Sequence, residues 1–287
     1  MKYICGIDEN GFGPVMGPLV VSATILNSKI KPSIFPEIRD SKLFFTSGIK
    51  KSYEKIEEFA ITVYFLLFSE LPQSPLDIIN RFCLPIKCEK KENLCLGNIP
   101  KKFLWAKPEI AVEKYRNFIE IMKFKIEDLS CSVVCPYKFN RMIEKENSKF
   151  VINLAEFCNL IKKSDKNMEI FAGKIGGLKY YLKYLKYFFP DFRISRIVED
   201  EKKSIYLLEK EKQSLKIGFY LDVEKISFPS VISSIVGKYV REIFMESIRR
   251  GIGIGEKISG YRDIKTRRVI ESIKFDKIEK ECVIRKK

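Results

Sequence analysis

One stretch near the start of the chain decides the fold: Gly6-Ile7-Asp8-Glu9-Asn10-Gly11-Phe12-Gly13-Pro14. Residues 3–7 are mostly apolar and predict a strand that runs directly into two adjacent carboxylates. A turn rich in Gly and Pro follows, and residues 19–26, rich in Val, Ile and Thr, predict a returning strand. This arrangement points Asp8 and Glu9 toward the mouth of a sheet, where glycines let the backbone approach a ligand closely.

The chain contains no histidine, so any hydrolytic chemistry must use carboxylates, lysines or a metal held by oxygen. Adjacent acids such as Asp8 and Glu9 are ordinarily surface charge. Their place between a strand and a glycine-rich turn instead favours a ligand set of hard oxygen donors, which suits Mg²⁺ or Mn²⁺ better than zinc.

The remainder of the chain alternates between helix and strand patterns. From Ser41 to about Asp128, amphipathic and irregular segments interrupted by prolines predict a helical insertion at about 45–125. Beyond it the pattern predicts strands at 131–135, 168–171, 192–198 and 215–221 and helices at 147–162, 178–188 and 232–244. This alternation predicts an α/β fold with a mixed or parallel sheet flanked by helices, within a single domain spanning 1–287.

Composition indicates a globular protein with a basic surface. The formal charge is +16, from 53 Lys and Arg against 37 Asp and Glu, which suits a polyanionic partner and equally a lysine-rich solvated surface. Eight cysteines are scattered without a C-x-x-C pair, and we expect them to be reduced. A zinc site using Cys83, Cys88, Cys95 and another thiol is the alternative.

No segment predicts attachment to a membrane. The longest apolar run, Phe59 to Phe68, has ten residues, whereas a bilayer span needs about 20. The first seven residues run straight into the predicted strand, which leaves no room for a secretory leader. We therefore expect a cytoplasmic protein that does not associate with membranes.

Four motifs in this order resemble ribonuclease HII. The segment from Gly6 to Val21 resembles that family's signature strand-turn-strand, and Asp40-Ser41-Lys42 resembles the Asp-Ser-Lys that follows it. Residues 230–242, Ser-Val-Ile-Ser-Ser-Ile-Val-Gly-Lys-Tyr-Val-Arg-Glu, are similar to the family's Ala-Ala-Ser-Ile-x-Ala-Lys helix. Gly260-Tyr261-x-Asp263-x-x-Thr266 resembles its C-terminal Gly-Tyr motif. The resemblance covers residues 6–266 apart from the insertion and implies a ribonuclease H-like fold.

The resemblance implies an endonuclease that cuts the RNA strand of RNA–DNA hybrids with two divalent cations, Mg²⁺ or Mn²⁺. It implies a protein that acts as a monomer without a small-molecule cofactor. The implied metal ligands are Asp8, Glu9 and Glu224, with Asp222 as the alternative to Glu224 as a catalytic carboxylate. The implied nucleic-acid contacts are Gly11, Phe12, Gly13, Lys42, Lys238 and Tyr261.

Three departures from the family pattern bear on activity. The family's fourth carboxylate, ordinarily Asp, falls on Glu224 when the motif is aligned without gaps, and Asp222 lies two residues away. Phe12 stands where ribonuclease HII has a basic residue, although ribonuclease HIII also lacks that arginine. The largest departure follows the strand at 168–171, where Ala172-Gly173 stands in place of the family's third Asp. A catalytically impaired relative that binds hybrid or branched nucleic acid is therefore the alternative function.

Overall fold

A computed structural model describes residues 2–35, 38, 45–46, 49–86, 90, 93–275 and 280–286. Within this part, seven strands form one mixed sheet in the order β3-β2-β1-β4-β7-β6-β5. The strands are β1 Tyr3–Asn10, β2 Leu19–Leu26, β3 Ile126–Val134, β4 Met168–Gly173, β5 Arg193–Glu199, β6 Lys203–Lys210 and β7 Gln213–Tyr220. The α-helices are α2 Lys50–Phe68, α3 Pro75–Phe82, α4 Pro108–Lys114, α5 Arg116–Met122, α6 Pro136–Glu146, α7 Lys149–Lys162, α8 Leu182–Phe188, α9 Phe228–Gly251 and α10 Ile264–Ser272. Short 3-10 helices lie at η1 Pro32–Ile34, η3 Val223–Lys225 and η4 Lys280–Cys282. The predicted α/β class with a mixed, helix-flanked sheet is confirmed.

The strand directions place three carboxyl ends at the same edge of the sheet. Strand β1 pairs with β2 in antiparallel fashion, as the sequence predicts for the strand-turn-strand unit. On its other side β1 runs parallel to β4, which in turn runs parallel to β7. Because parallel strands end on one edge, the residues that follow β1, β4 and β7 are brought together there.

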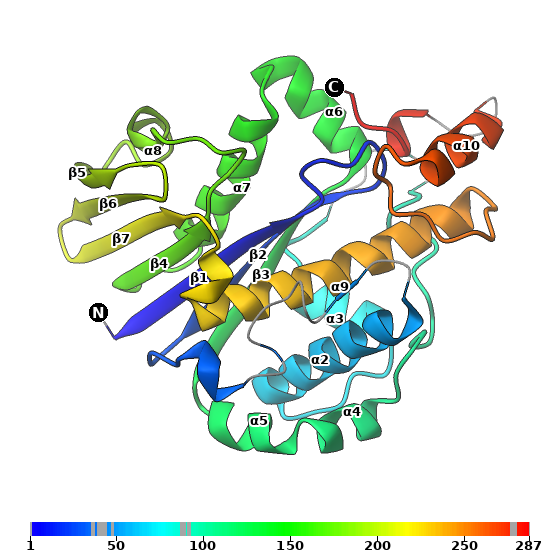
Figure 1. The fold of residues 1–287 in the computed structure, drawn as a ribbon, viewed down its shortest axis with the longest axis horizontal. Helices are drawn as coiled ribbons and strands as arrows, with labels where there is room; N and C mark the ends of the chain where they lie inside the picture. The colour runs from blue at the N-terminus through cyan, green and yellow to red at the C-terminus, as the bar shows by residue number, and fades with distance from the viewer. Residues whose placement is uncertain are drawn as a thin grey trace.

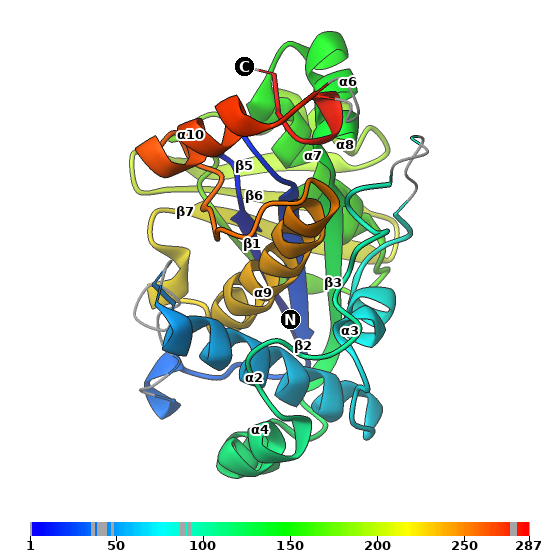
Figure 2. The same ribbon diagram turned by 90° about the vertical axis from the view of Figure 1, so that its right-hand side faces the viewer.

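The sheet is covered by helices on both faces (Figures 1 and 2). Strand β2 is buried along its whole length, and its alternating residues enter two separate hydrophobic clusters. Leu19 and Val21 lie in the cluster that includes α7, whereas Val20 lies in the cluster that includes α9 and α2. A strand buried on both faces explains why residues 19–26 read as an almost continuous apolar run.

Helix α9 lies directly on β1 because the residues between them are small. A Cβ at Gly6 would lie 2.0 Å from the backbone nitrogen of Ser230, and one at Gly237 would lie 2.3 Å from Ser22 Oγ. Hydroxyl groups join the same surfaces, since Ser233 Oγ donates to the Gly6 carbonyl at 2.8 Å. This close contact sets the first turns of α9 beside the carboxyl half of β1.

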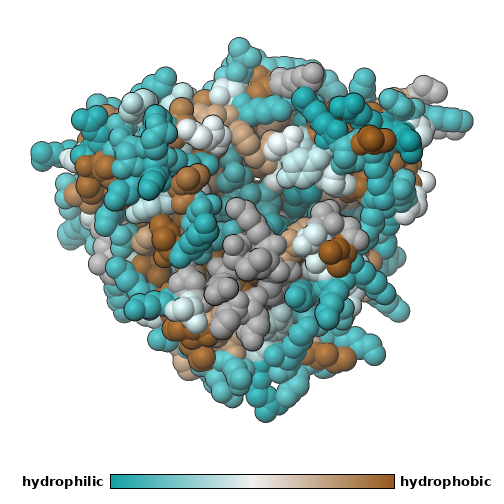
Figure 3. Space-filling view, viewed as in Figure 1, coloured by the Kyte–Doolittle hydropathy of each residue, from teal (hydrophilic) through white to brown (hydrophobic). Residues whose placement is uncertain are grey.

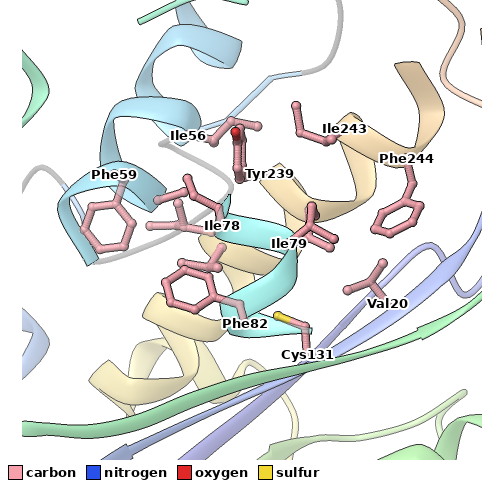
Figure 4. Close-up of a cluster of buried hydrophobic side chains, with 14 of the residues drawn as sticks. Val20, Ile56, Phe59, Ile78, Ile79, Phe82, Cys131, Tyr239, Ile243 and Phe244 are labelled. Carbon is pink, nitrogen blue, oxygen red and sulfur yellow. The ribbon is translucent and has the colours of Figure 1, made fainter. Parts of the chain in front are cut away.

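Helices α2 to α5 occupy the predicted insertion and pack on the α9 side of the sheet (Figure 1). Figure 4 shows Ile78, Ile79 and Phe82 of α3 lying between Tyr239 of α9 and Cys131 of β3. All five side chains belong to one hydrophobic cluster. We propose that the whole chain is a single domain, because the insertion shares the core of the sheet.

The structure corrects several predicted boundaries. Strand β3 begins at Ile126, so the helical segment expected to reach about Asp128 ends earlier. Helix α8 begins at Leu182 and not at 178, because the backbone before it bonds to side chains of β6: Tyr181 N donates to the Tyr206 hydroxyl and the Lys179 carbonyl accepts from Ser204. Helix α6 and strand β6 were not predicted. No helix among the described residues is long and apolar enough to cross a membrane.

Candidate functional site

A cavity of about 430 Å³ opens at the edge of the sheet where β1, β4 and β7 end. The loop after β7, the first turns of α9 and the segment before α10 complete its wall. Its lining residues are Asp8, Glu9, Asn10, Gly11, Gly173, Lys174, Tyr220, Leu221, Asp222, Val223, Glu224, Ser234, Lys238 and Tyr261. The cavity thus gathers most of the residues that the sequence singled out, from five separate parts of the chain.

Burial in the cavity disfavours the charged forms of Asp8 and Glu9. Burial raises the pKa of Asp8 to about 6, and the neighbouring Glu224 adds to the rise. Burial also raises the pKa of Glu9, with further contributions from Asp8 and Glu224. Mutual effects of this kind require the three carboxylates to lie near one another. The expected convergence of these acids is therefore found, and it leaves a concentration of negative charge that a cation would neutralise.

Two side chains on successive turns of α9 oppose that charge. The hydroxyl of Ser234 donates a hydrogen bond to Asp8, and the ammonium of Lys238 acts on the same carboxylate from a greater distance. Both effects lower the pKa of Asp8 against the larger effect of burial. Lys238 Nζ also lies 3.4 Å from Ser234 Oγ, which fits their i, i+4 spacing on one helix face.

Glu224 and Asp222 line the cavity in different ways. Glu224 lies in η3 and acts electrostatically on both Asp8 and Glu9. Asp222 accepts a hydrogen bond from Lys225 Nζ at 2.8 Å, and its side chain is 44% exposed. Glu224 therefore acts on both strand carboxylates, whereas the side chain of Asp222 is half-exposed and paired with Lys225.

The structure resolves which residue stands where the third Asp was expected. Ala172 pairs with Ile7 and is fully buried in the hydrophobic core. Gly173 is the next residue and faces the opposite way, so a Cβ added there would lie 3.7 Å from Asp8 Oδ1 and 3.8 Å from Glu9 Oε2. Gly173 is therefore the position from which a third carboxylate would enter the cavity, and it has room for one.

Only some of the predicted nucleic-acid contacts line the cavity. Gly11 and Tyr261 line the cavity, and a Cβ at Gly13 would lie 3.5 Å from the Tyr261 ring. Phe12 is partly buried and packs toward Gly176, outside the described lining. Lys42, with the rest of the Asp-Ser-Lys motif, lies outside the described residues.

Two acids near the β4 strand that could replace the missing Asp lie elsewhere. Glu169, at the start of β4, pairs with Lys29 at 3.3 Å and with Lys216 at 2.8 Å. Asp191 pairs with Lys210 at 3.3 Å. Neither residue lines the cavity.

The donor chemistry of the cavity suits a hard cation, because its partly buried carboxylate oxygens carry more negative charge than Lys238 can neutralise. The donor positions do not complete a site. In the described part of the chain, no three Asp, Glu or Cys side chains are arranged to hold a metal ion.

Four of the described cysteines contact one another in two separate pairs. Cys83 forms a hydrogen bond with Cys131, and Cys95 with Cys135. The seven cysteines that the structure describes are all free thiols. Cys88, the remaining residue of the alternative zinc set, lies outside the described residues. Cys83 and Cys95 thus contact different thiols of β3 and its C-terminal flank.

Sequence reasoning did not assign roles to Ser234, Tyr220 or Lys174, which also line the cavity. Ser234 had a detectable signal, since it lies four residues before Lys238 on the predicted long helix. Lys174 Nζ donates to the carbonyl oxygens of Asp200 at 2.5 Å and Glu201 at 3.0 Å, and nothing in the sequence pattern indicated that contact.

The chain is thus an α/β protein with an acid-lined cavity at the carboxyl edge of its mixed sheet. No family model matches the chain. Three curated relatives that match parts of it are each named ribonuclease HII. The protein from Methanocella arvoryzae is 38% identical over 112 residues, covering 38% of this chain and 45% of the relative. The protein from Caldicellulosiruptor saccharolyticus is 31% identical over 86 residues, covering 30% of this chain and 40% of the relative. The protein from Thermococcus sibiricus is 43% identical over 77 residues, covering 26% of this chain and 32% of the relative.

Solved structures that match include ribonuclease HII in its complex with PCNA from Archaeoglobus fulgidus, at 16% identity and a TM-score of 0.47, covering 99% of this chain and 96% of that one. Bst-RNase HIII in complex with Mn²⁺ matches at 14% identity and a TM-score of 0.46, covering 98% and 65%. The chain spans less than half the length of the curated relatives that it matches. The partial sequence matches show that parts of this chain are similar to proteins named ribonuclease HII, as the four motifs predicted.

Proposed function

We propose that the protein is a ribonuclease H-type endonuclease that cleaves the RNA strand of RNA–DNA hybrids. The observation that carries this proposal is the gathering of Asp8, Glu9 and Glu224 around one cavity at the edge of the sheet. The similarity to proteins named ribonuclease HII supports the same reaction class. With no histidine in the chain, hydrolysis of a phosphodiester must use carboxylates, lysines or a metal held by oxygen, and this cavity supplies the carboxylates.

We propose that Asp8, Glu9 and Glu224 bind divalent cations, Mg²⁺ or Mn²⁺. Two such ions would supply an activated water and stabilise the leaving oxygen. The chain's own contribution is to position these acids and to favour the ionised form of Asp8 against the effect of burial. Ser234 and Lys238 do this for Asp8, since both favour its charged form.

The nucleic acid would lie over the cavity, in contact with Tyr261, Lys238 and the backbone at Gly11. Tyr261 is 49% exposed and is therefore available to pack against a sugar. The net charge of +16 and the mainly hydrophilic face in Figure 3 suit a polyanionic partner. A phosphate contact by Lys42, action as a monomer, and a cytoplasmic location are part of this proposal.

The alternative function is binding of hybrid or branched nucleic acid with little or no cleavage. One observation favours it: β4 ends in Gly173, which offers no donor to the cavity. Losing one of four ligands weakens the binding of metal and raises the barrier to hydrolysis.

Cleavage of a labelled RNA–DNA hybrid by the parent and by Asp8→Asn, with Mg²⁺ and with Mn²⁺, tests the proposal. We expect cleavage by the parent and a loss of more than about a hundredfold in the variant, because removing even a group that only orients a metal ligand costs about 10- to 100-fold. Duplex DNA of the same sequence is the substrate control. Binding without cleavage by the parent would establish the alternative, and equal cleavage by both proteins would exclude Asp8 from the site.

A further inference from the structure

The side chain of Arg285 is buried without a hydrogen-bond partner, beside the turn that follows Asp8 and Glu9. The residue is 4% exposed, and its Nε, Nη1 and Nη2 atoms form no hydrogen bond. Its backbone nitrogen donates to the Val15 carbonyl at 2.8 Å, and Ile284 forms a β-bridge with Met16. Its guanidinium lies against the Phe139 ring, with Cζ 4.9 Å from the ring centroid. No anion among the described residues therefore balances this guanidinium under the 11–17 turn.

A second buried guanidinium lies beside it. Arg241 of α9 is 6% exposed, and its Nε also lacks a hydrogen-bond partner. Its side chain passes directly under the turn, since a Cβ at Gly11 would lie 2.6 Å from Arg241 Nε. Burial lowers the pKa of Arg285 to about 9, and the charge of Arg241 contributes to that fall. The two guanidinium groups are thus close enough to repel each other.

Among the described acids, Glu242 pairs with Arg241, which leaves the charge of Arg285 unbalanced. Glu242 accepts from Arg241 Nη1 at 3.3 Å, and burial raises the pKa of Glu242 despite that contact. Arg285 forms no ion pair with any described carboxylate. An unpaired charge in a protein interior is costly, so a buried cation of this kind calls for an anion as its partner. Five N–H donors in a planar fork match the oxygens of a phosphate group.

We propose that Arg285 and Arg241 form a phosphate-binding site beneath the Gly11–Gly13 turn, occupied by a backbone phosphate of the bound nucleic acid. The identity of the occupant rests on the proposed function, whereas the site itself rests on the unpaired guanidinium. The half-exposed ring of Tyr261 lies against Arg241, with its centroid 6.0 Å from Arg241 Cζ. Because Tyr261 also lines the acid-lined cavity, the proposed site lies next to that cavity.

Thermal unfolding of the metal-free full chain tests the site without any nuclease assay. The parent, Arg285→Met and Arg193→Met are compared in sodium phosphate and in sodium chloride at equal ionic strength. Arg193 is an exposed arginine on the edge strand β5, so its replacement controls for the change in net charge. We expect phosphate to raise the Tm of the parent and of Arg193→Met relative to chloride. Arg285→Met loses that rise, and in chloride its Tm exceeds the parent's because an unpaired buried cation has been removed.

Hybrid binding in EDTA distinguishes a backbone phosphate from free phosphate. For Arg285→Met we expect the slope of log affinity against log salt to be shallower by about one, as for the loss of one phosphate contact. A lost thermal response with an unchanged slope would assign the site to free phosphate and overturn the backbone assignment. If Arg285→Met matched the parent in both measurements, the site would be disproved.

Arg285→Lys provides the second variant, in case the methionine protein does not fold. Circular dichroism checks the fold of each variant. The lysine keeps the charge but not the planar fork, so we expect a phosphate response smaller than the parent's. A response equal to the parent's would show that the fork is not used, and would contradict the proposed geometry.

Discussion

Strands β1 and β4 are parallel neighbours whose carboxyl ends reach the same cavity, yet they bring different chemistry to it. Strand β1 contributes Asp8 and Glu9, both with raised pKa values. Strand β4 contributes Gly173, whose missing side chain would have met both acids within 3.8 Å. The framework that positions a metal-binding set is therefore present at both strands, while one of its donors is missing.

The difference shows that the backbone position for a metal ligand can be kept while the ligating side chain is lost. The backbone around Gly173 is fixed by pairing with β1 on one side and with β7 on the other. Its φ is not positive, so a residue with a side chain can occupy the position without backbone strain. The loss is confined to one side chain, which makes it open to a direct experimental test.

The largest effect on stability is expected one residue earlier, at Ala172. Asp there would place a charge in the apolar core, because Ala172 is fully buried among hydrophobic residues. We expect Ala172→Asp to lose about 3–5 kcal/mol in the free energy of unfolding, the range found for uncompensated buried charges. Gly173→Asp is the matched control, since the same substitution on the other face should cost less. Urea unfolding measures both, and equal losses would show that residues 172 and 173 do not face opposite sides.

A smaller effect concerns the pH dependence that Asp8 gives the metal-free protein. Its pKa of about 6 in the folded protein exceeds the ordinary value of 3.8 for an aspartate, so folding takes up a proton between these pH values. Asp8 therefore lowers stability as pH rises through this range, and the full cost applies above about pH 6. We expect Asp8→Asn to unfold at a higher temperature than the parent at pH 8, with the gain shrinking as pH falls toward 4.

Thermal unfolding of both proteins in EDTA across pH 4–8 measures this gain. A constant difference at every pH would mean that Asp8 does not titrate in this range. Glu224→Gln provides a comparison, because removing the neighbouring charge should lower the pKa of Asp8 and move the transition to lower pH.

The sequence predicted the parts of the site that depend on short-range pattern. The turn after Glu9 and the serine-rich start of α9 could be predicted because α9 and the sheet approach closely. This approach restricts the residue types at positions such as Gly6 and Gly237. Strand β6 was not predicted, since its apolar centre is short and flanked by lysines and glutamate. Helix α6 was missed because it begins at a proline and has few apolar residues.

The choice between Ala172 and Gly173 could not be made from the sequence. Both residues are small, and only the pairing of Ala172 with Ile7 shows which of them faces the acids. The unpaired Arg285 is likewise invisible in the sequence, because its burial depends on a β-bridge to residue 16, far along the chain. Both features depend on strand pairing between residues far apart in the chain, which a local sequence pattern does not reveal.

The most direct test of the account is hybrid cleavage by the parent, Gly173→Asp and Gly173→Asn across a titration of Mg²⁺ and of Mn²⁺. Asn has the size of Asp without its charge, so it isolates the contribution of the carboxylate. We predict that Gly173→Asp cleaves faster than the parent and reaches half-maximal rate at about 10- to 100-fold lower metal concentration, whereas Gly173→Asn does not. A parent that already cleaves as fast as Gly173→Asp at the same metal concentration would contradict the claim that the missing carboxylate at the end of β4 limits this site.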